Sequence, residues 1–253
     1  MSLMNYIKKK ITRFSYKVVN KVLNSCGLSL IETKNLGVYN SLCLQYAWLK
    51  SVETQKPIDS ENMEIPWFTF PAIEYLSQID MRDFDIYEWG SGNSSKFFAR
   101  RCRSITSIES NLEWFDYGSD NLEENQKIKL LNYQEYATEI DKENMKYDVI
   151  IIDGIDRYEC AKAALNNIKK GGMIILDNSD WNPNACELLR SSLQYIEVDF
   201  HGFGPINSYS WTTSVFIDKN AKLMNLKDRQ PHYSKAAIVQ TSTYDKRTKY
   251  EDV

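Results

Sequence analysis

From about residue 84 onward, the apolar residues of the chain form short runs that are separated by stretches with helical periodicity. Runs such as "VIII" and "MIIL" are apolar at every position, which is typical of strands in a parallel sheet that is covered on both faces. Strands are predicted near 84–89, 104–109, 128–132, 147–153 and 172–177, with helices near 94–102, 112–124, 156–169 and 183–193. This alternation predicts a doubly wound α/β sheet whose strands are mostly parallel.

Two further strands are predicted near 195–201 and 211–217, and only a loop that contains "GFGP" joins them. We expect this pair to be antiparallel at one edge, which gives a seven-stranded sheet. The segments on either side do not show this alternation of apolar runs and helical stretches. We expect a helical N-terminal extension or cap over 1–60, the sheet domain over 61–218, and a polar C-terminal tail over 219–253.

The N-terminal extension is predicted to begin with a basic amphipathic helix. Over residues 5–25 apolar residues recur at helical spacing, six Lys and Arg lie between them, and no acid occurs before Glu32. Such a helix can lie on an anionic membrane surface. Alternatively, its apolar stripe packs on the chain's own body or on a second subunit, which leaves a homo-oligomer open. Further helices are predicted over 39–52 and after Pro71.

The composition excludes several classes of protein. A formal net charge of −3 disfavours a nucleic-acid partner. The five cysteines are scattered without a CxxC pair, which favours reduced thiols and a cytoplasmic location over a zinc site or a disulfide framework. Only two histidines are present, which excludes a His-rich metal site. No apolar run approaches the ~20 residues that cross a bilayer.

The stretch "EWGSGNSS", Glu88 to Ser95, joins the first predicted strand to a helix. Gly90 and Gly92 allow a sharp turn and leave room for a ligand against the backbone. Asn93, Ser94 or Ser95 would cap the helix and present amide donors. This position, outside the carboxyl end of the first strand, is where open α/β sheets bind ligands. The alternative is an ordinary strand-to-helix turn without a ligand.

An acid at the end of the second strand supports the ligand interpretation. Glu109 lies about 20 residues after the loop, where a carboxylate can hydrogen-bond the hydroxyls of a ribose. A dinucleotide loop needs a third glycine where this chain has Ser95, which disfavours NAD. Glu88, two residues before the first glycine, would suit the cationic end of S-adenosylmethionine (SAM).

These motifs together resemble class I SAM-dependent methyltransferases, a group with a Rossmann-like sheet. "YEWGSGNSS" looks like the glycine-rich motif, "SIES" like the ribose-binding strand end, and "YDVIIIDG" and "KKGGMIILDN" like the fourth and fifth strands. The resemblance covers roughly Trp67 to Asp218 and extends to an uncharacterised methyltransferase-like group with a "PWFTFPAIEYL" segment. It implies SAM as cofactor, with Asn132 or Glu135 as the residue that reads adenine.

Asp153, Asp177 and Asn178 follow the fourth and fifth strands, so they are expected at the same rim of the sheet. Their oxygens suit Mg²⁺, and the set is similar to the metal triad of catechol O-methyltransferase-like enzymes. The lysine base of those enzymes is replaced here by Asp156, with Arg157 after it. The alternative is that Asp153 contacts only the cofactor and that Asp177 and Asn178 cap a turn.

Two further residues are candidates for catalysis. Arg157 is expected either to clamp an acidic substrate or to form a structural ion pair with Asp153 or Asp180. His201 follows an edge strand and is either a general base or a structural residue. The sequence therefore predicts a SAM-dependent methyltransferase that acts on oxygen or nitrogen of a small molecule, with metal assistance left open. The alternative is a catalytically degenerate binding protein with the same fold.

Overall fold

The computed structural model describes residues 15, 17–19, 21–23, 25–26, 36–192, 194–227, 231–240 and 242. The chain divides into two compact units, 1–41 and 42–253. The division places residues 42–60, which were expected in the extension, in the unit that contains the sheet. Most of the predicted basic helix over 5–25 lies outside the described residues, so its membrane or subunit contact stays a prediction. No described helix combines the length and the apolar character needed to cross a membrane.

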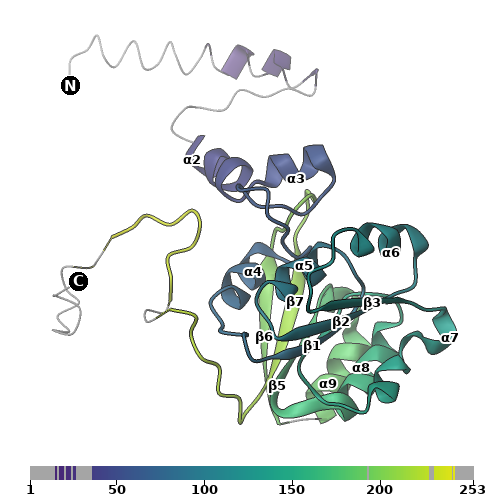
Figure 1. The fold of residues 1–253 in the computed structure, drawn as a ribbon. Helices are drawn as coiled ribbons and strands as arrows, with labels where there is room; N and C mark the ends of the chain where they lie inside the picture. The colour runs from purple at the N-terminus through teal and green to yellow at the C-terminus, as the bar shows by residue number, and fades with distance from the viewer. Residues whose placement is uncertain are drawn as a thin grey trace. The chain divides into compact units, whose positions relative to one another are not determined.

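The larger unit is built around a sheet that has seven strands in the described part of the chain (Figure 1). The strands are β1 (Asp85–Trp89), β2 (Ser104–Glu109), β3 (Gln126–Leu130), β4 (Tyr147–Ile152), β5 (Ile168–Leu176), β6 (Tyr195–Gly202) and β7 (Trp211–Asp218). Their spatial order is β3-β2-β1-β4-β5-β7-β6. The first five are parallel, whereas β7 runs antiparallel to both β5 and β6. The predicted fold class and the antiparallel edge pair are confirmed.

The helices of the larger unit are α3 (Trp48–Thr54), α4 (Phe70–Leu76), α5 (Asn93–Ala99), α6 (Leu112–Ser119), α7 (Tyr133–Tyr136), α8 (Arg157–Asn167) and α9 (Pro183–Ser192), with short 3₁₀ turns η3 (Glu139–Glu143) and η4 (Ser179–Trp181). Of these, α4 and α5 cover one face of the sheet and α8 and α9 cover the other (Figure 1). Ile150 and Ile152 of β4 pack with α8 and α9, while Val149 and Ile151 pack with α4 and α5. Alternate residues of one strand point to opposite faces, which explains why the run is apolar throughout.

Two elements differ from the sequence prediction. The helix expected over 39–52 is interrupted at Ala47, whose φ of 54° is left-handed. Ahead of it lie α2 (Leu36–Tyr39) and the π-helical turn η2 (Asn40–Gln45). Strand β5 begins at Ile168, earlier than expected, because Ile168 already pairs with Tyr147. The register then shifts before Met173 pairs with Val149, and Gly171, with φ of 85°, lies in between.

The described part of the C-terminal tail is attached to the larger unit. Asn225 forms an isolated bridge with Ile79, and the Asp80 amide donates to the Met224 carbonyl. Lys235 forms an ion pair with Asp59 at 3.0 Å. These contacts hold the segment beside the residues that follow α4 and beside the loop that contains Asp59.

The direction in which successive strands are added reverses between β1 and β4. Strands β2 and β3 are added on one side of β1, and β4 and β5 are added on its other side. Loops that leave neighbouring strands at such a point turn in opposite directions, and a crevice forms between them. The segments that follow β1, β2, β4 and β5 all meet there.

Candidate functional site

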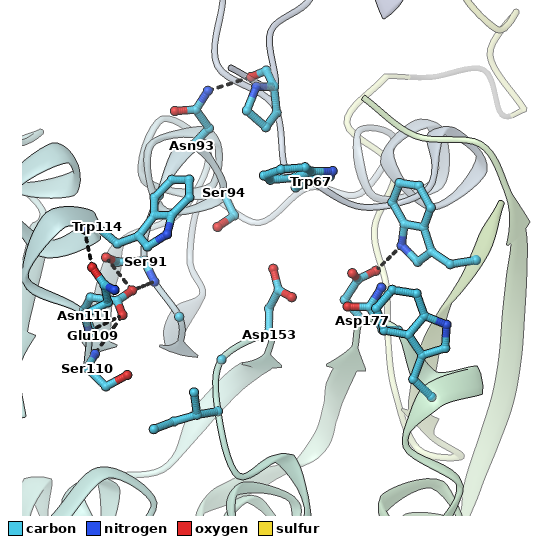
Figure 2. A pocket seen from close by; sticks show the side chains of 18 of the residues that line it. Trp67, Ser91, Asn93, Ser94, Glu109, Ser110, Asn111, Trp114, Asp153 and Asp177 are labelled. Atoms are coloured by element: carbon cyan, nitrogen blue, oxygen red, sulfur yellow. Dashed lines mark hydrogen bonds between the residues drawn. The ribbon is translucent and has the colours of Figure 1, made fainter. Parts of the chain in front are cut away.

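A cavity of about 420 Å³ lies at the carboxyl ends of β1, β2, β4 and β5 (Figure 2). This volume is within the usual range for small-molecule sites. Among the predicted site residues, the cavity wall contains Gly90, Gly92, Asn93, Ser94, Glu109, Asp153, Asp177 and Asn178. The fold therefore brings together most of the residues that the sequence singled out, although their individual roles remain predictions.

The loop after β1 approaches the loop after β4 without intervening side chains. Gly90 has φ of 96°, and a Cβ there would lie 3.0 Å from the carbonyl carbon and oxygen of Asp153. A Cβ on Gly154 would lie 1.8 Å from the Tyr136 hydroxyl. Because bare backbone fits on both sides, the two loops define the floor of the cavity.

Glu109 closes one end of the cavity and is held firmly by the surrounding backbone. Its Oε1 accepts hydrogen bonds from the amides of Ser110 at 2.7 Å and Asn111 at 2.9 Å. Its Oε2 accepts from the Ser91 amide at 2.9 Å and from the Ser91 hydroxyl at 3.2 Å. The hydroxyl contact is the longest of these, so a ligand hydroxyl can replace it without disturbing the backbone.

Glu88 does not face the cavity, which corrects the prediction that it meets the cationic end of a ligand. The side chain is fully buried, and its Oε2 accepts from the hydroxyls of Ser95 at 2.5 Å and Ser107 at 2.6 Å. Burial raises the pKa of Glu88 to about 7, although the hydroxyl contacts oppose this shift. The period-2 geometry of β1 explains its placement, because Glu88 points to the opposite face from Tyr87 and Trp89.

Asp153 and Asp177 form the centre of the cavity and share the neighbourhood of a guanidinium group. Arg157, the first residue of α8, donates from Nη2 to Asp153 Oδ1 at 3.1 Å and from Nε to the Gly154 carbonyl at 2.9 Å. It also contacts the Asp177 carbonyl. This geometry favours the structural ion pair over the substrate clamp, and Asp180 instead accepts from the Thr212 amide.

Both carboxyl groups have perturbed acidity. Burial raises the pKa of Asp153 to about 6, and the Arg157 charge opposes this shift. The pKa of Asp177 is also raised, first by burial and then by the negative charge of Asp153. Asp177 Oδ1 accepts from Trp211 Nε1 at 3.1 Å and from Thr213 Oγ1 at 2.5 Å. The protein thus fixes the direction of this carboxyl group.

The predicted magnesium site does not fit this arrangement. The Arg157 guanidinium already places positive charge where the ends of β4 and β5 meet, and Asp177 Oδ1 is engaged by two protein donors. Asn178 adopts a left-handed conformation at the start of η4. Within the described ranges, no group of three or more His, Cys, Asp and Glu side chains could hold a metal. The donor set is therefore that of a carboxylate–guanidinium cluster.

Aromatic side chains, Trp211 among them, form much of the cavity wall. Trp67, Trp114, Trp181 and Tyr209 also line the cavity. The buried Trp67 Nε1 has no hydrogen-bond partner among the described residues, so it offers a donor to a ligand. A tryptophan in each of the loops "IPWFTF" and "NSDWNP" was the available signal, but their convergence depends on the tertiary fold.

Two predicted site residues lie elsewhere. Asn132 caps α7, where its Oδ1 accepts from the Glu135 amide at 3.2 Å, and neither residue lines the cavity. His201 is on β6, its Nδ1 is 2.7 Å from Thr212 Oγ1, and it lines a separate hollow. The antiparallel turn of the edge pair directs His201 away from the carboxyl ends of β4 and β5. Both assignments are therefore corrected.

The cysteines were expected to be reduced thiols. All five lie within the described ranges and are free. Cys43, Cys160 and Cys186 are buried, and burial raises the pKa of the Cys186 thiol to about 11. They behave as small apolar side chains of the core.

Several solved structures of methyltransferases are similar to the chain, while no protein-family model and no curated protein sequence matches it. An O-methyltransferase from Bacillus cereus in complex with S-adenosylhomocysteine (SAH) is 18% identical with a TM-score of 0.53, covering 73% of this chain and 97% of its own. The O-methyltransferase TomG from Streptomyces achromogenes, involved in tomaymycin synthesis and in complex with SAM, is 14% identical with a TM-score of 0.51, covering 75% and 100%. The chain therefore has the fold of these two O-methyltransferases.

Proposed function

We propose that the protein binds SAM in the cavity described above and transfers its methyl group to a small-molecule acceptor. The observation that carries the proposal is the meeting of the Gly90–Gly92 loop, Glu109 and Asp153 in one cavity at the strand-order reversal. When bound, SAM supplies a methyl group on a positively charged sulfur.

In this proposal, Glu109 holds the ribose hydroxyls and the bare backbone of Gly90 and Gly92 borders the rest of the cofactor. The ionised forms of Asp153 and Asp177 lie near the positive sulfur and favour its binding electrostatically. Trp114 lies on the Glu109 side of the cavity (Figure 2). Trp181 belongs to the Asp177 side, because its ring contacts Tyr209, which in turn contacts Trp211, the donor to Asp177. This division gives the cofactor and the acceptor opposite ends of the same space.

A small acceptor is favoured over a macromolecule by the size and the charge of the site. The cavity volume is about 420 Å³, the lining includes Glu109, Asp153 and Asp177, and the chain carries a net charge of −3. A nucleic-acid phosphate backbone would be repelled by such a surface. The role of the protein in transfer is then mainly to align the acceptor with the methyl group.

Titration calorimetry with SAH tests the proposal. We expect saturable one-to-one binding to the wild-type protein, and a loss of about 1–3 kcal/mol of binding free energy in Glu109→Ala, the scale of a charge-assisted hydrogen bond. Glu124→Ala, which removes an exposed acid away from the cavity, is the matched control. Equal affinity in the wild type and Glu109→Ala would contradict the placement. Binding of SAH without transfer to any acceptor would favour the degenerate binding protein.

A further inference from the structure

The cavity wall has a strong bias in charge. Glu109, Asp153 and Asp177 contribute carboxyl groups, whereas none of the described lining residues is Lys, Arg or His. The nearest guanidinium, that of Arg157, is turned toward Asp153 and the backbone carbonyls of the strand ends. A ligand with a carboxylate or phosphate next to Asp177 would meet like charge, and a cation would meet opposite charge.

The Asp177 side of the cavity also has a wall of aromatic rings. The ring centroids of Trp181 and Tyr209 are 6.2 Å apart, and those of Tyr209 and Trp211 are 6.1 Å apart. Trp181 is 59% exposed and Tyr209 is 49% exposed, although both are large and mostly apolar. The hydrogen bond from Trp211 Nε1 to Asp177 ties this wall to a carboxylate (Figure 2). Aromatic faces beside a carboxylate form a typical environment for an ammonium group.

The available proton acceptors also favour nitrogen over oxygen. A hydroxyl is a weak nucleophile until it loses a proton, and neither a lysine nor a fitting metal site is found among the described cavity residues to help remove it. An ammonium gives up its proton more readily than a hydroxyl does, and the Asp153 carboxylate lies in the same cavity to accept it. The resulting amine needs no further activation.

We propose, on the basis of the proposed function, that the acceptor is an amine that binds as a cation between the Trp181–Tyr209–Trp211 wall and the carboxylates of Asp177 and Asp153. The ammonium first loses one proton to the Asp153 carboxylate. A bond then forms between the amine nitrogen and the methyl carbon, the bond from that carbon to sulfur breaks, and its electron pair remains on sulfur. The products are a methylated ammonium and neutral SAH, and Asp153 returns its proton to solvent.

The proposal is tested by binding two probes of equal shape to SAH-saturated protein. Choline carries a quaternary ammonium, and 3,3-dimethylbutan-1-ol is its uncharged carbon isostere. We expect choline to bind about 10-fold more tightly, because the cation interacts with the rings and the carboxylates. Equal or tighter binding of the alcohol would overturn the proposal, and so would the absence of detectable choline binding.

Variants locate the preference within the cavity. Asp177→Asn keeps the oxygen that accepts from Trp211 and Thr213 but removes the charge, and Trp181→Ala removes an exposed ring. We expect each to reduce the preference for choline to about threefold or less. Asp180→Asn and Tyr158→Ala are matched controls outside the cavity wall, and they should keep the wild-type preference. An unchanged preference in both Asp177→Asn and Trp181→Ala would overturn the proposed location.

The saturation step separates this proposal from the proposed function. If SAH itself fails to bind, the proposed function is wrong and the acceptor assignment falls with it. If SAH binds and choline is not preferred, only the amine assignment is wrong.

Discussion

The two ends of the central strands differ in how well the charges of their buried acidic side chains are neutralised. At the amino end, Asp85 of β1 accepts from Arg103 Nε at 2.9 Å, and Lys169 of β5 lies 3.2 Å from Asp85 and 2.7 Å from Asp148. At the carboxyl end, Asp153 and Asp177 are close to the Arg157 guanidinium, which forms an ion pair only with Asp153 in the described structure. At the amino end, cations therefore balance the negative charge of the buried acids. At the carboxyl end, one cation lies beside two buried acids.

The pKa directions follow this difference. Hydrogen bonding from Arg103 holds the pKa of Asp85 well below its usual range, against the effect of burial. At the other end, burial dominates and raises the pKa of Asp153 to about 6. Acids that are buried without full compensation reduce stability, and such acids concentrate where a ligand binds. The comparison identifies the amino end as structural and the carboxyl end as the candidate functional end.

The largest expected effect comes from removing the cation of the carboxyl end. The side chains of Arg157 and Asp153 are 15% and 21% exposed, so Arg157→Ala leaves a mostly buried charge without its partner. We expect a loss of about 3 kcal/mol in the free energy of unfolding at pH 8, measured by urea denaturation. The loss should shrink below pH 6, because Asp153 can then bind a proton.

Arg103→Ala is the matched control at the amino end. Arg103 is 54% exposed, and Lys169 remains beside Asp85 after the substitution, so the loss of stability should be much smaller than for Arg157→Ala. Equal losses in the two variants would remove the contrast between the ends of the sheet.

A second, smaller effect concerns Glu88, which lies beneath the glycine loop. Its pKa is raised from 4.5 to about 7, so the folded protein binds a proton more tightly than the unfolded chain between these values. The free energy of unfolding of the wild type therefore decreases as pH rises from about 4.5 to about 7. Glu88→Gln has no carboxyl group at this position, so its free energy of unfolding should not show this decrease. Between pH 5 and pH 8, we expect the variant to gain about 2 kcal/mol relative to the wild type. If the free energy of unfolding changes with pH in the same way in the wild type and in Glu88→Gln, burial does not raise the pKa of Glu88.

The sheet was predictable from the sequence because its signal is local. Continuous apolar runs such as residues 149–152 mark strands covered on both faces, and turns with glycine or polar residues separate them. The antiparallel edge pair followed from the short connection between residues 202 and 211. Gly90, Glu109 and Asp153 were placed in one site because parallel strands end at the same edge.

The other parts of the site depend on contacts that no local pattern encodes. The face of Glu88 depends on the register of β1 against β2, which sets Ser107 opposite it. His201 lies near the end of β6, and the antiparallel pairing of β6 with β7 places it in a hollow separate from the main cavity. The aromatic side chains that line the cavity, such as Trp67, Trp181 and Tyr209, come from segments far apart in the sequence. Arg157 was left open between two roles, and only its distances to Asp153 and to the backbone of the strand ends favour one of them.

A crystal structure of the protein with SAH tests the central claim most directly, that the carboxyl end of the sheet holds the cofactor. We predict that the ribose hydroxyls lie within hydrogen-bond distance of Glu109 and that the sulfur lies over Gly90–Gly92, facing Asp153. The side of the cavity formed by Asp177 and Trp181 should remain open for the acceptor. SAH bound outside this cavity, or bound inside it with its ribose away from Glu109, would contradict the account.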